Sequence, residues 1–307
     1  MKLVENPTLR NTGVDALVPK APITVLVPTL NEERNLADCL KHLDWADEVV
    51  VVDSNSTDAT REIAETHGAK VVNFAWNGQW PKKKNWAMAN VPSRHGWILI
   101  VDADEWIVPE LAAEIAAAIQ SEEHVGYYIN RRFMFMGRWI KHSGYYPSWN
   151  LRLLKRGCGE YEQLTDVGDT SSGDNEVHEH IRVNGPVGHL KSDMLHFAFP
   201  TIAVWVEKHN RYTNWEAIVQ LKGAHASGPE SLNPMLARRR RLKNFSKRLP
   251  FRPTLRFLYS YIFRRGFLDG RPGYVLCRLQ SIYEFLSVVK YEELRKGASN
   301  ADRSKTR

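Results

Sequence analysis

Acidic side chains follow three of the apolar runs in this sequence, at the points where the runs end. The first run closes on Pro28-Thr29-Leu30-Asn31-Glu32, the second is followed by Asp53, and a later one closes on Asp102-Ala103-Asp104. Carboxylates gathered in one place repel one another unless a cation or hydrogen-bond donors lie between them. Hard oxygen ligands suit Mg²⁺ or Mn²⁺. The pattern therefore predicts a site for a divalent ion that bridges a diphosphate.

The elements that must position these side chains are short strands alternating with helical or polar segments. Apolar runs at 23–30, 48–54, 69–76 and 97–106 are rich in β-branched residues, and Pro109 opens a helical segment where proline suits a first turn. Such alternation predicts an open, mostly parallel sheet covered on both faces. Ligands bind such sheets beyond the carboxyl ends of the strands. The first part of the chain is therefore expected to be an α/β nucleotide-binding half.

The motifs at these strand ends resemble a known family. VPTLNE, VVVDSNSTDAT and ILIVDADE occur in this order, with KKKNWA between the second and third. They are similar to the nucleotide-sugar half of family 2 glycosyltransferases, which have the GT-A fold. NLRLLKRG, VHEHI, HLKSDMLHFAF and GFLDGRPGY extend the resemblance to the subfamily of lipopolysaccharide-core β-1,4-glucosyltransferases, over roughly residues 20–295. The QxxRW motif of processive members is absent, which favours the transfer of a single sugar.

The resemblance implies which residues bind the donor. The nucleotide-sugar set is Pro28, Leu30, Asn31, Glu32, Asp53, Lys84, Asn85 and Asp102. Within it, Asp53 is expected to hydrogen-bond the base or ribose, and Lys84 and Asn85 to face the nucleotide or its phosphates. The DxD motif of the family falls on Asp102 and Asp104, with Asp104 expected as the direct metal ligand and Asp102 reaching the ribose or the metal. In an extended chain such side chains point the same way, so both can serve one site.

An inverting transfer also needs a base that removes the proton of the attacking hydroxyl. The resemblance places a His-Glu pair at His178-Glu179, so Glu179 is the expected base. A neighbouring histidine, His178 or His180, can orient this carboxylate or tune its pKa. Asp166 and Asp174 in the preceding polar loop remain alternatives.

The positive charge of the chain is concentrated near its end. Residues 235–307 hold 19 Lys and Arg against 5 Asp and Glu, a net charge of +14, whereas the whole chain carries +7. The run Arg238–Arg241 is followed by basic residues interleaved with aromatic and aliphatic ones up to Phe263. This mixture is typical of a segment that lies on an anionic membrane surface. Nucleic acid is the less favoured anionic partner.

The expected organisation has four parts: an N-terminal extension at 1–20, a nucleotide-sugar-binding α/β half at 21–126, an acceptor and catalytic half at 127–200, and a helical membrane-associating tail at 201–307. The first residues lack the apolar core of a signal peptide, and no run approaches about 18 apolar residues. We therefore expect a cytoplasmic protein, peripheral on the inner face of the cytoplasmic membrane.

The expected function is the metal-dependent, inverting transfer of one hexose, with glucose as the expected sugar, from a UDP-linked donor to a lipid-linked glycan such as lipopolysaccharide core or an exopolysaccharide precursor. Two alternatives remain. A sugar-phosphate nucleotidyltransferase has a similar sheet but normally a glycine-rich loop after its first strand, and VPTLNEE has no glycine. A non-catalytic basic module that binds membrane or nucleic acid is the other, and the acidic residues at 53, 102 and 104 argue against it.

Overall fold

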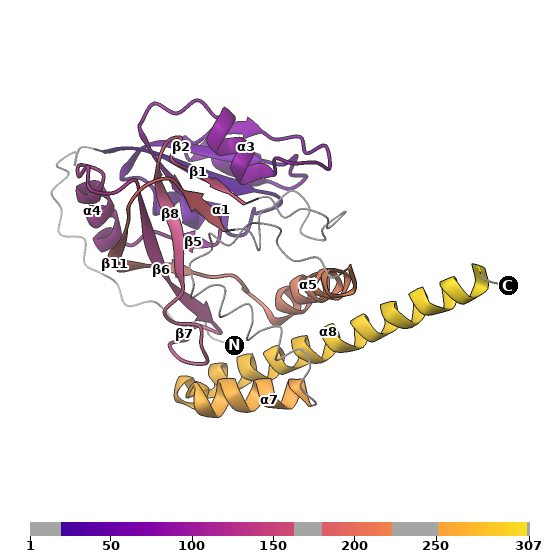
Figure 1. The fold of residues 1–307 in the computed structure, drawn as a ribbon. Helices are drawn as coiled ribbons and strands as arrows, with labels where there is room; N and C mark the ends of the chain where they lie inside the picture. The colour runs from indigo at the N-terminus through magenta and orange to yellow at the C-terminus, as the bar shows by residue number, and fades with distance from the viewer. Residues whose placement is uncertain (1–19, 163–179, 223–250, 306–307) are drawn as a thin grey trace.

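The computed structural model describes residues 20–162, 180–222 and 251–305, with side chains of the last helix described as far as 297. The first half of the sheet is parallel, as predicted, and its strands lie in the order β3-β2-β1-β4. Its strands are β1 (Ala21–Thr29), β2 (Ala46–Asp53), β3 (Lys70–Asn73) and β4 (Trp97–Ile100). The helices between and after them are α1 (Leu36–Lys41), α2 (Thr60–Thr66), α3 (Lys83–Asn90) and α4 (Pro109–Ala118). Figure 1 shows these elements in indigo and purple.

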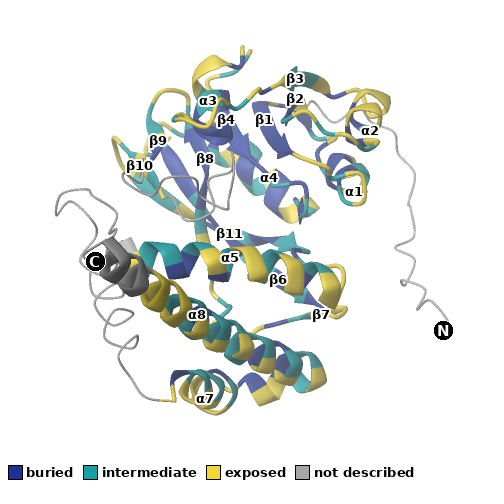
Figure 2. Ribbon diagram, turned by 90° about the vertical axis from the view of Figure 1, so that its right-hand side faces the viewer, coloured by how far each residue is buried: buried dark blue, intermediate teal, exposed yellow. Residues whose placement is uncertain are grey.

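Both faces of this half are covered, which explains the unbroken apolar character of its strands. In β1, Ile23, Val25 and Val27 belong to one core with residues of α1 and α4. Leu26 points to the opposite face and shares a second core with Ala87 of α3. Because successive strand residues alternate between the faces, a strand buried on both sides needs apolar residues at every position. In Figure 2, β1, β2 and β4 are accordingly mostly dark blue, whereas β3 at the edge of the sheet is not.

The sheet continues without a break into the second half. The strands there are β8 (Trp149–Lys155), β6 (Gly126–Phe135), β11 (Val187–His196) and β5 (Glu105–Trp106), in that order beyond β4, with β7 (Arg138–Trp139) paired to β6. β8 runs antiparallel to both β4 and β6, whereas β6 and β11 are parallel. A separate pair, β9 (Gly159–Tyr161) and β10 (Ile181–Val183), lies outside this sheet. Within the described ranges, one nine-stranded sheet thus spans residues 21–196.

The predicted single strand at 97–106 is wrong, because the chain turns after Ile100. Residues 101–104 form a turn, and Glu105–Trp106 pairs as β5 with the end of β11, at the far side of the sheet from β4. Glu105 closes the turn twice: its Oε2 accepts the backbone N–H of Asp102 at 3.0 Å, and its own N–H donates to the Asp102 carbonyl at 2.9 Å. Asp102 and Asp104 therefore do not lie on an extended chain.

The C-terminal part of the described chain is helical and packs on the second half of the sheet. It consists of α5 (Ile202–Lys222), α7 (Arg252–Leu258), a π-helical turn η1 (Tyr259–Phe263), a 3-10 turn η2 (Gly266–Asp269) and the long α8 (Gly270–Lys305). Phe133 and Phe135 of β6 share a core with Trp205 of α5 and Leu276 of α8. Figure 1 shows α7 and α8 below the sheet, with α5 between them and the strands. No helix in the described residues is both long and apolar enough to cross a bilayer.

Candidate active site

Asp102 is held between two basic side chains from opposite sides of the β4 end. Lys84 of α3 places its Nζ 2.8 Å from Oδ1, and Arg152 of β8 places its Nη2 2.5 Å from Oδ2. Burial raises the pKa of the Asp102 carboxyl, but Arg152 and Lys84 outweigh it and hold that pKa well below its usual range. The carboxylate is therefore ionised and fixed in orientation.

Arg152 links this carboxylate to a second one that the sequence analysis did not single out. Its Nη2 also lies 2.7 Å from Oε1 of Glu105, which is completely buried. Arg131 of β6 approaches the same Oε1 with its Nη1 at 3.3 Å. Three cations, Lys84, Arg152 and Arg131, thus contact two carboxylates, Asp102 and Glu105. An arginine within the apolar run NLRLL was the available signal, since a strand that is otherwise buried rarely holds an unpaired arginine.

Asp104 has a different neighbour from Asp102. His196 at the end of β11 places its Nε2 3.6 Å from Oδ1 of Asp104. Pairing of β5 with β11 sets this distance, because His196 lies opposite Glu105 in the ladder. Burial raises the pKa of Asp104, but the contact with His196 more than offsets this and lowers the pKa overall. Within the described ranges, no group of three or more His, Cys, Asp or Glu side chains is arranged so that it could hold a metal ion.

The polar loops after β1 and β2 are tied to each other. The backbone N–H of Asn31 donates to Ser56 Oγ at 2.9 Å, and Asn31 Oδ1 accepts the N–H of Thr57 at 2.8 Å. Asn31 has a φ of 55°, a left-handed conformation that asparagine tolerates. Glu32 donates its N–H to Thr60 Oγ1 at 2.8 Å, and its pKa is raised by burial and by Asp104 and Asp102 nearby, although Asn35 opposes the shift. Glu32 and the DxD carboxylates therefore do converge at one edge.

Asp53 and the residues before Asn31 have contrasting exposures. Pro28 is buried, whereas Leu30 is 46% exposed and presents an apolar surface at the β1 end. Asp53 is fully buried, with its oxygens accepting hydrogen bonds from the hydroxyls of Ser56 and Thr29 and from the Ser56 backbone N–H. In this structure Asp53 shapes the loop after β2.

The KKKNWA segment forms the start of α3 and is buried, which excludes a solvated lysine face. Lys82, Lys83 and Lys84 have relative exposures of 8%, 1% and 6%. Lys83 Nζ donates to the Thr29 carbonyl at 2.7 Å and so ties α3 to the end of β1. Asn85 pairs with the backbone of Tyr161 in β9: its Nδ2 donates to the carbonyl at 3.0 Å and its Oδ1 accepts the N–H at 2.7 Å. Lys84 thus faces the Asp102 site, whereas Asn85 anchors β9.

Glu179, the predicted base, lies outside the described residues. His178, Asp166 and Asp174 also lie outside them, as do the basic run 238–241 and residues 1–19 of the predicted extension. The chain is described again from His180, whose backbone N–H donates to Oε1 of Glu162 at 3.3 Å and whose carbonyl accepts the Glu162 N–H at 2.9 Å. The role of Glu179 stays a prediction.

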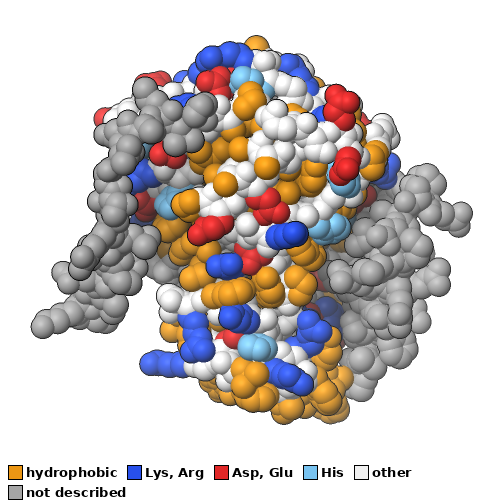
Figure 3. Space-filling view, turned by 90° about the vertical axis from the view of Figure 1, so that its left-hand side faces the viewer, with side chains coloured by type: hydrophobic (Ala, Val, Ile, Leu, Met, Phe, Trp, Pro, Cys, Tyr) orange, Lys and Arg blue, Asp and Glu red, His pale blue; other side chains and the backbone are white. Residues whose placement is uncertain are grey.

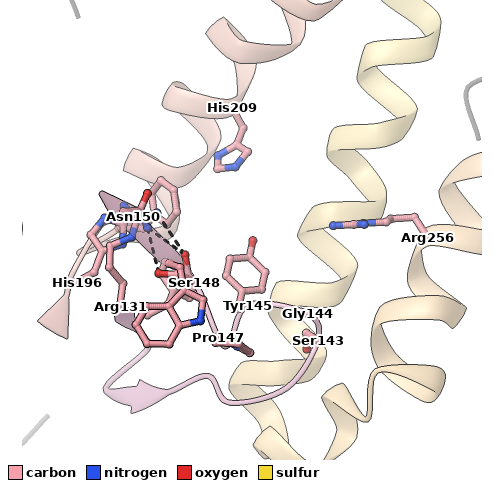
Figure 4. Close-up of a pocket in the computed structure, with 14 residues that line it drawn as sticks. Arg131, Ser143, Gly144, Tyr145, Pro147, Ser148, Asn150, His196, His209 and Arg256 are labelled. Carbon is pink, nitrogen blue, oxygen red and sulfur yellow. Dashed lines mark hydrogen bonds between the residues drawn. The ribbon is translucent and has the colours of Figure 1, made fainter. Parts of the chain in front are cut away.

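A cavity of about 570 Å³ lies beside this site, between the sheet and the helical part. Figure 4 shows Arg131, Asn150 and His196 on its sheet side, His209 above and Arg256 entering from α7. A second cavity of about 280 Å³ is lined by residues that include Asp104, Trp106 and Arg34. His196 borders the larger cavity and Asp104 the smaller one, so the pair stands between the two.

Comparison with known proteins shows the family to which the chain belongs. Residues 24–182, just over half of the chain, match the family model of glycosyl transferase family 2. The chain belongs to this family. Its mixed, mostly parallel open sheet followed by a helical region is of the GT-A type. The matched residues contain Asp102, Asp104 and Lys84, whereas His196 lies beyond them.

Several relatives match over most of their length. The lipopolysaccharide core biosynthesis glycosyltransferase LpsC of Rhizobium meliloti is 28% identical over 284 residues, which are 89% of this chain and 93% of that protein. An uncharacterized glycosyltransferase of Rickettsia typhi is 26% identical over 89% of this chain and 87% of its own.

Solved structures are also similar to this one. Residues 1–349 of S. aureus TarS in complex with UDP are 19% identical with a TM-score of 0.45, covering 90% of this chain and 91% of that one. Glucosyl-3-phosphoglycerate synthase from Mycobacterium tuberculosis, in complex with Mn²⁺, UDP and phosphoglyceric acid, is 22% identical with a TM-score of 0.30, covering 36% and 43%.

Proposed function

We propose that this family 2 glycosyltransferase transfers a single hexose, with glucose as the expected sugar, from a nucleotide diphosphate sugar to a lipid-linked glycan of the lipopolysaccharide-core type, and releases the nucleotide diphosphate. The observation that carries the proposal is the strand-end arrangement in which Lys84 and Arg152 fix Asp102 while Asp104 faces His196. The LpsC relative, which spans nearly the whole chain, supports the choice of acceptor.

The charges of the site suit a diphosphate. Lys84 and Arg152 are buried and lie at the carboxyl end of β4, where ligands bind in open α/β sheets. Lys84, Arg152 and Arg131 would bring positive charge close to a diphosphate bound there. Asp102, ionised and held on both oxygens, is placed to accept hydrogen bonds from ribose hydroxyls.

The divalent ion is assigned to Asp104 and His196. Each oxygen of Asp102 already contacts a cation, whereas the Asp104 carboxylate lies 3.6 Å from an imidazole nitrogen and borders a cavity. A carboxylate oxygen and an imidazole nitrogen are ligands that Mn²⁺ and, with more water, Mg²⁺ accept. When bound, the ion would act as a Lewis acid that stabilises the charge of the departing diphosphate.

The test is the substitution Asp104→Asn with UDP and Mn²⁺ as probes. Removing the charge should abolish the dependence of UDP binding on Mn²⁺ in calorimetry while leaving the melting temperature near that of the wild type. Glu110→Gln is the matched control, because Glu110 is an exposed carboxylate six residues further on, in the first turn of α4. A variant at Asp104 that binds UDP with unchanged Mn²⁺ dependence would contradict the assignment.

The base of the proposed reaction is Glu179. A base acts only on the attacking hydroxyl, so Glu179→Gln should leave donor affinity nearly unchanged and slow single-turnover transfer by roughly 10²- to 10⁴-fold. Donor calorimetry on the same folded variant separates this role from a structural one, in which the melting temperature and donor affinity would fall together. Transfer within a few-fold of the wild type would move the role to Asp166 or Asp174.

The proposed place of action is the cytoplasmic face of the membrane. Exposed apolar and basic side chains alternate over α7, η1, η2 and the start of α8, and we call this region the apolar–basic surface. Its apolar members are Phe251, Leu255, Leu258, Tyr259, Ile262, Phe263, Phe267, Leu268 and Tyr274, and its basic members are Arg264, Arg265, Arg271 and Arg278. Figure 3 shows orange and blue side chains next to each other at the lower end of the molecule. Such a surface fits anionic lipids.

A further inference from the structure

The cavity of about 570 Å³ beside His196 has a composition that no part of the donor site explains. Its lining comes from three places: β6, β8 and the loop between them, the end of β11 with α5, and Arg256 of α7. Aspartate and glutamate are absent from the described residues that line it, although two arginines are present. Figure 4 shows these arginines on opposite sides, Arg131 on the sheet and Arg256 on the helical part.

Each of the two arginines has a hydrogen-bond donor that finds no acceptor among the described residues. The Nε atoms of Arg131 and Arg256 are buried and make no hydrogen bond within the described residues. Arg256 donates from Nη2 to the neutral Gln280 at 2.7 Å, so its charge is not balanced by a carboxylate at that contact. Arg131 shares Glu105 with Arg152. A buried hydrogen-bond donor without an acceptor lowers the stability of the protein unless a ligand supplies the acceptor. A cationic donor forms its strongest hydrogen bonds with an anionic ligand.

The remaining lining suits a sugar ring. Phe133, Tyr145, Trp149 and Phe199 supply aromatic surface, and Asn150 and Ser148 supply amide and hydroxyl groups. His209 is neutral at physiological pH, because burial lowers its pKa to about 4. Its Nδ1 contacts the Trp205 carbonyl at 2.8 Å and must be the protonated nitrogen, which leaves Nε2 as a hydrogen-bond acceptor for a hydroxyl.

The cavity also reaches the reacting end of the site. His196 lines it and contacts Asp104, so a ligand in the cavity would lie directly beside the residues assigned to the donor. We propose that this cavity is the acceptor subsite and that it takes an anionic sugar, one bearing a carboxylate or a phosphate held between Arg131 and Arg256. This inference rests on the proposed function and adds the chemical class of its acceptor.

The experiment measures binding of simple sugars to the full chain by ligand-observed NMR. The probes are glucuronic acid for a carboxylate, glucose 6-phosphate for a phosphate, and glucose as the neutral control. Wild-type protein should bind at least one anionic probe and bind glucose at least about tenfold more weakly, because charge-assisted hydrogen bonds are lost. The tighter of the two anions identifies the group. If the wild-type protein binds glucose as tightly as it binds the two anions, the proposal is overturned without the use of any variant.

Substitutions then locate the binding site. Arg256→Gln should weaken the anionic probe at least about tenfold, Arg256→Lys should retain part of the affinity, and Arg61→Gln should have no effect. Arg61 is the control because it is an exposed arginine of α2 that does not line the cavity. UDP binding should be unchanged in all three. Unchanged anion binding in Arg256→Gln would overturn the inference, whereas a wild type that binds the anions but not UDP would instead refute the proposed function.

Discussion

Arg152 is the residue on which the electrostatics of the site depend. One buried guanidinium contacts both Asp102 and Glu105, and burial of its charge is compensated by these two carboxylates, which raise its pKa overall. Removing one partner of a buried ion pair leaves the remaining charge uncompensated in a poorly solvated place. The resulting loss of folding free energy is larger than the net contribution of the intact pair. Arg152 is therefore expected to be among the least replaceable residues of the site.

We expect Arg152→Met to lower the free energy of unfolding by about 3–5 kcal/mol, because Glu105 and Asp102 lose their shared cation. Urea unfolding followed by circular dichroism measures this loss. Arg156→Met is the control, since Arg156 is exposed just after the same strand and should change stability by less than about 1 kcal/mol. Equal stabilities of the two variants would show that the network of Arg152 does not stabilise the fold.

The sequence predicted the acidic residues of the site better than their partners. Asp102, Asp104 and Glu32 follow apolar runs, and the parallel sheet brings such ends together whatever the rest of the chain does. Arg152 and His196 lie on β8 and β11, and their approach to the DxD loop depends on the order of strands across the whole sheet. Pairing between strands so far apart in sequence leaves no local pattern.

At the level of elements, the turn after β4 is the main departure from prediction. WILIVDADEW contains near-continuous apolar residues and two alternating carboxylates, so its periodicity fits a single strand. The structure divides it because Glu105 satisfies the backbone of Asp102 and then pairs with β11. The start of α3 gives no helical signal for a related reason, since three consecutive lysines show no apolar periodicity although all three are buried.

α3 and β9 are joined by Asn85, and this junction can be tested. Asn85→Ala leaves the N–H and carbonyl of Tyr161 without their side-chain partners, so we expect a loss of stability of about 1–3 kcal/mol and faster hydrogen exchange at residues 159–161. Asn85→Asp, which can accept but not donate, should fall between. Exchange at 159–161 that is unchanged in the alanine variant would mean that Asn85 does not anchor β9.

At the scale of the whole molecule, the helical part packs against the second half of the sheet and is not a detached tail. α5 lies within the region 201–307 that was predicted to be helical, and Phe133 and Phe135 of β6 pack into the same core as Trp205 and Leu276. The predicted boundary at 200 follows the end of β11, but sequence periodicity alone could not show that Phe133 and Phe135 of β6 belong to the core of the helical part. The apolar–basic surface is left on the side away from the sheet, as Figures 1 and 2 show for α7 and α8.

Phe263→Asp should weaken binding to anionic vesicles at least about tenfold, because a fully buried phenylalanine contributes about 1.5–3 kcal/mol and the new charge is repelled. Phe263 is 76% exposed, and Val206 of α5, 52% exposed, gives the control Val206→Asp. Sedimentation with phosphatidylserine vesicles measures binding, which should also fall with salt. Equal sedimentation of both variants would contradict the proposed surface, and preference for duplex DNA would favour a nucleic-acid partner.

The position of β11 in the sheet determines which fragments of this chain can fold on their own. The residues matched by the family model end at 182, and β11 begins at Val187, between β6 and β5 in the sheet. A fragment cut at the family boundary would expose the edge of β6, leave β5 without a partner and lack His196 altogether. The same dependence makes the chain suited to complementation: a fragment through residue 182 and one from 187 onward should regain the paired Asp104 and His196 only when both are present.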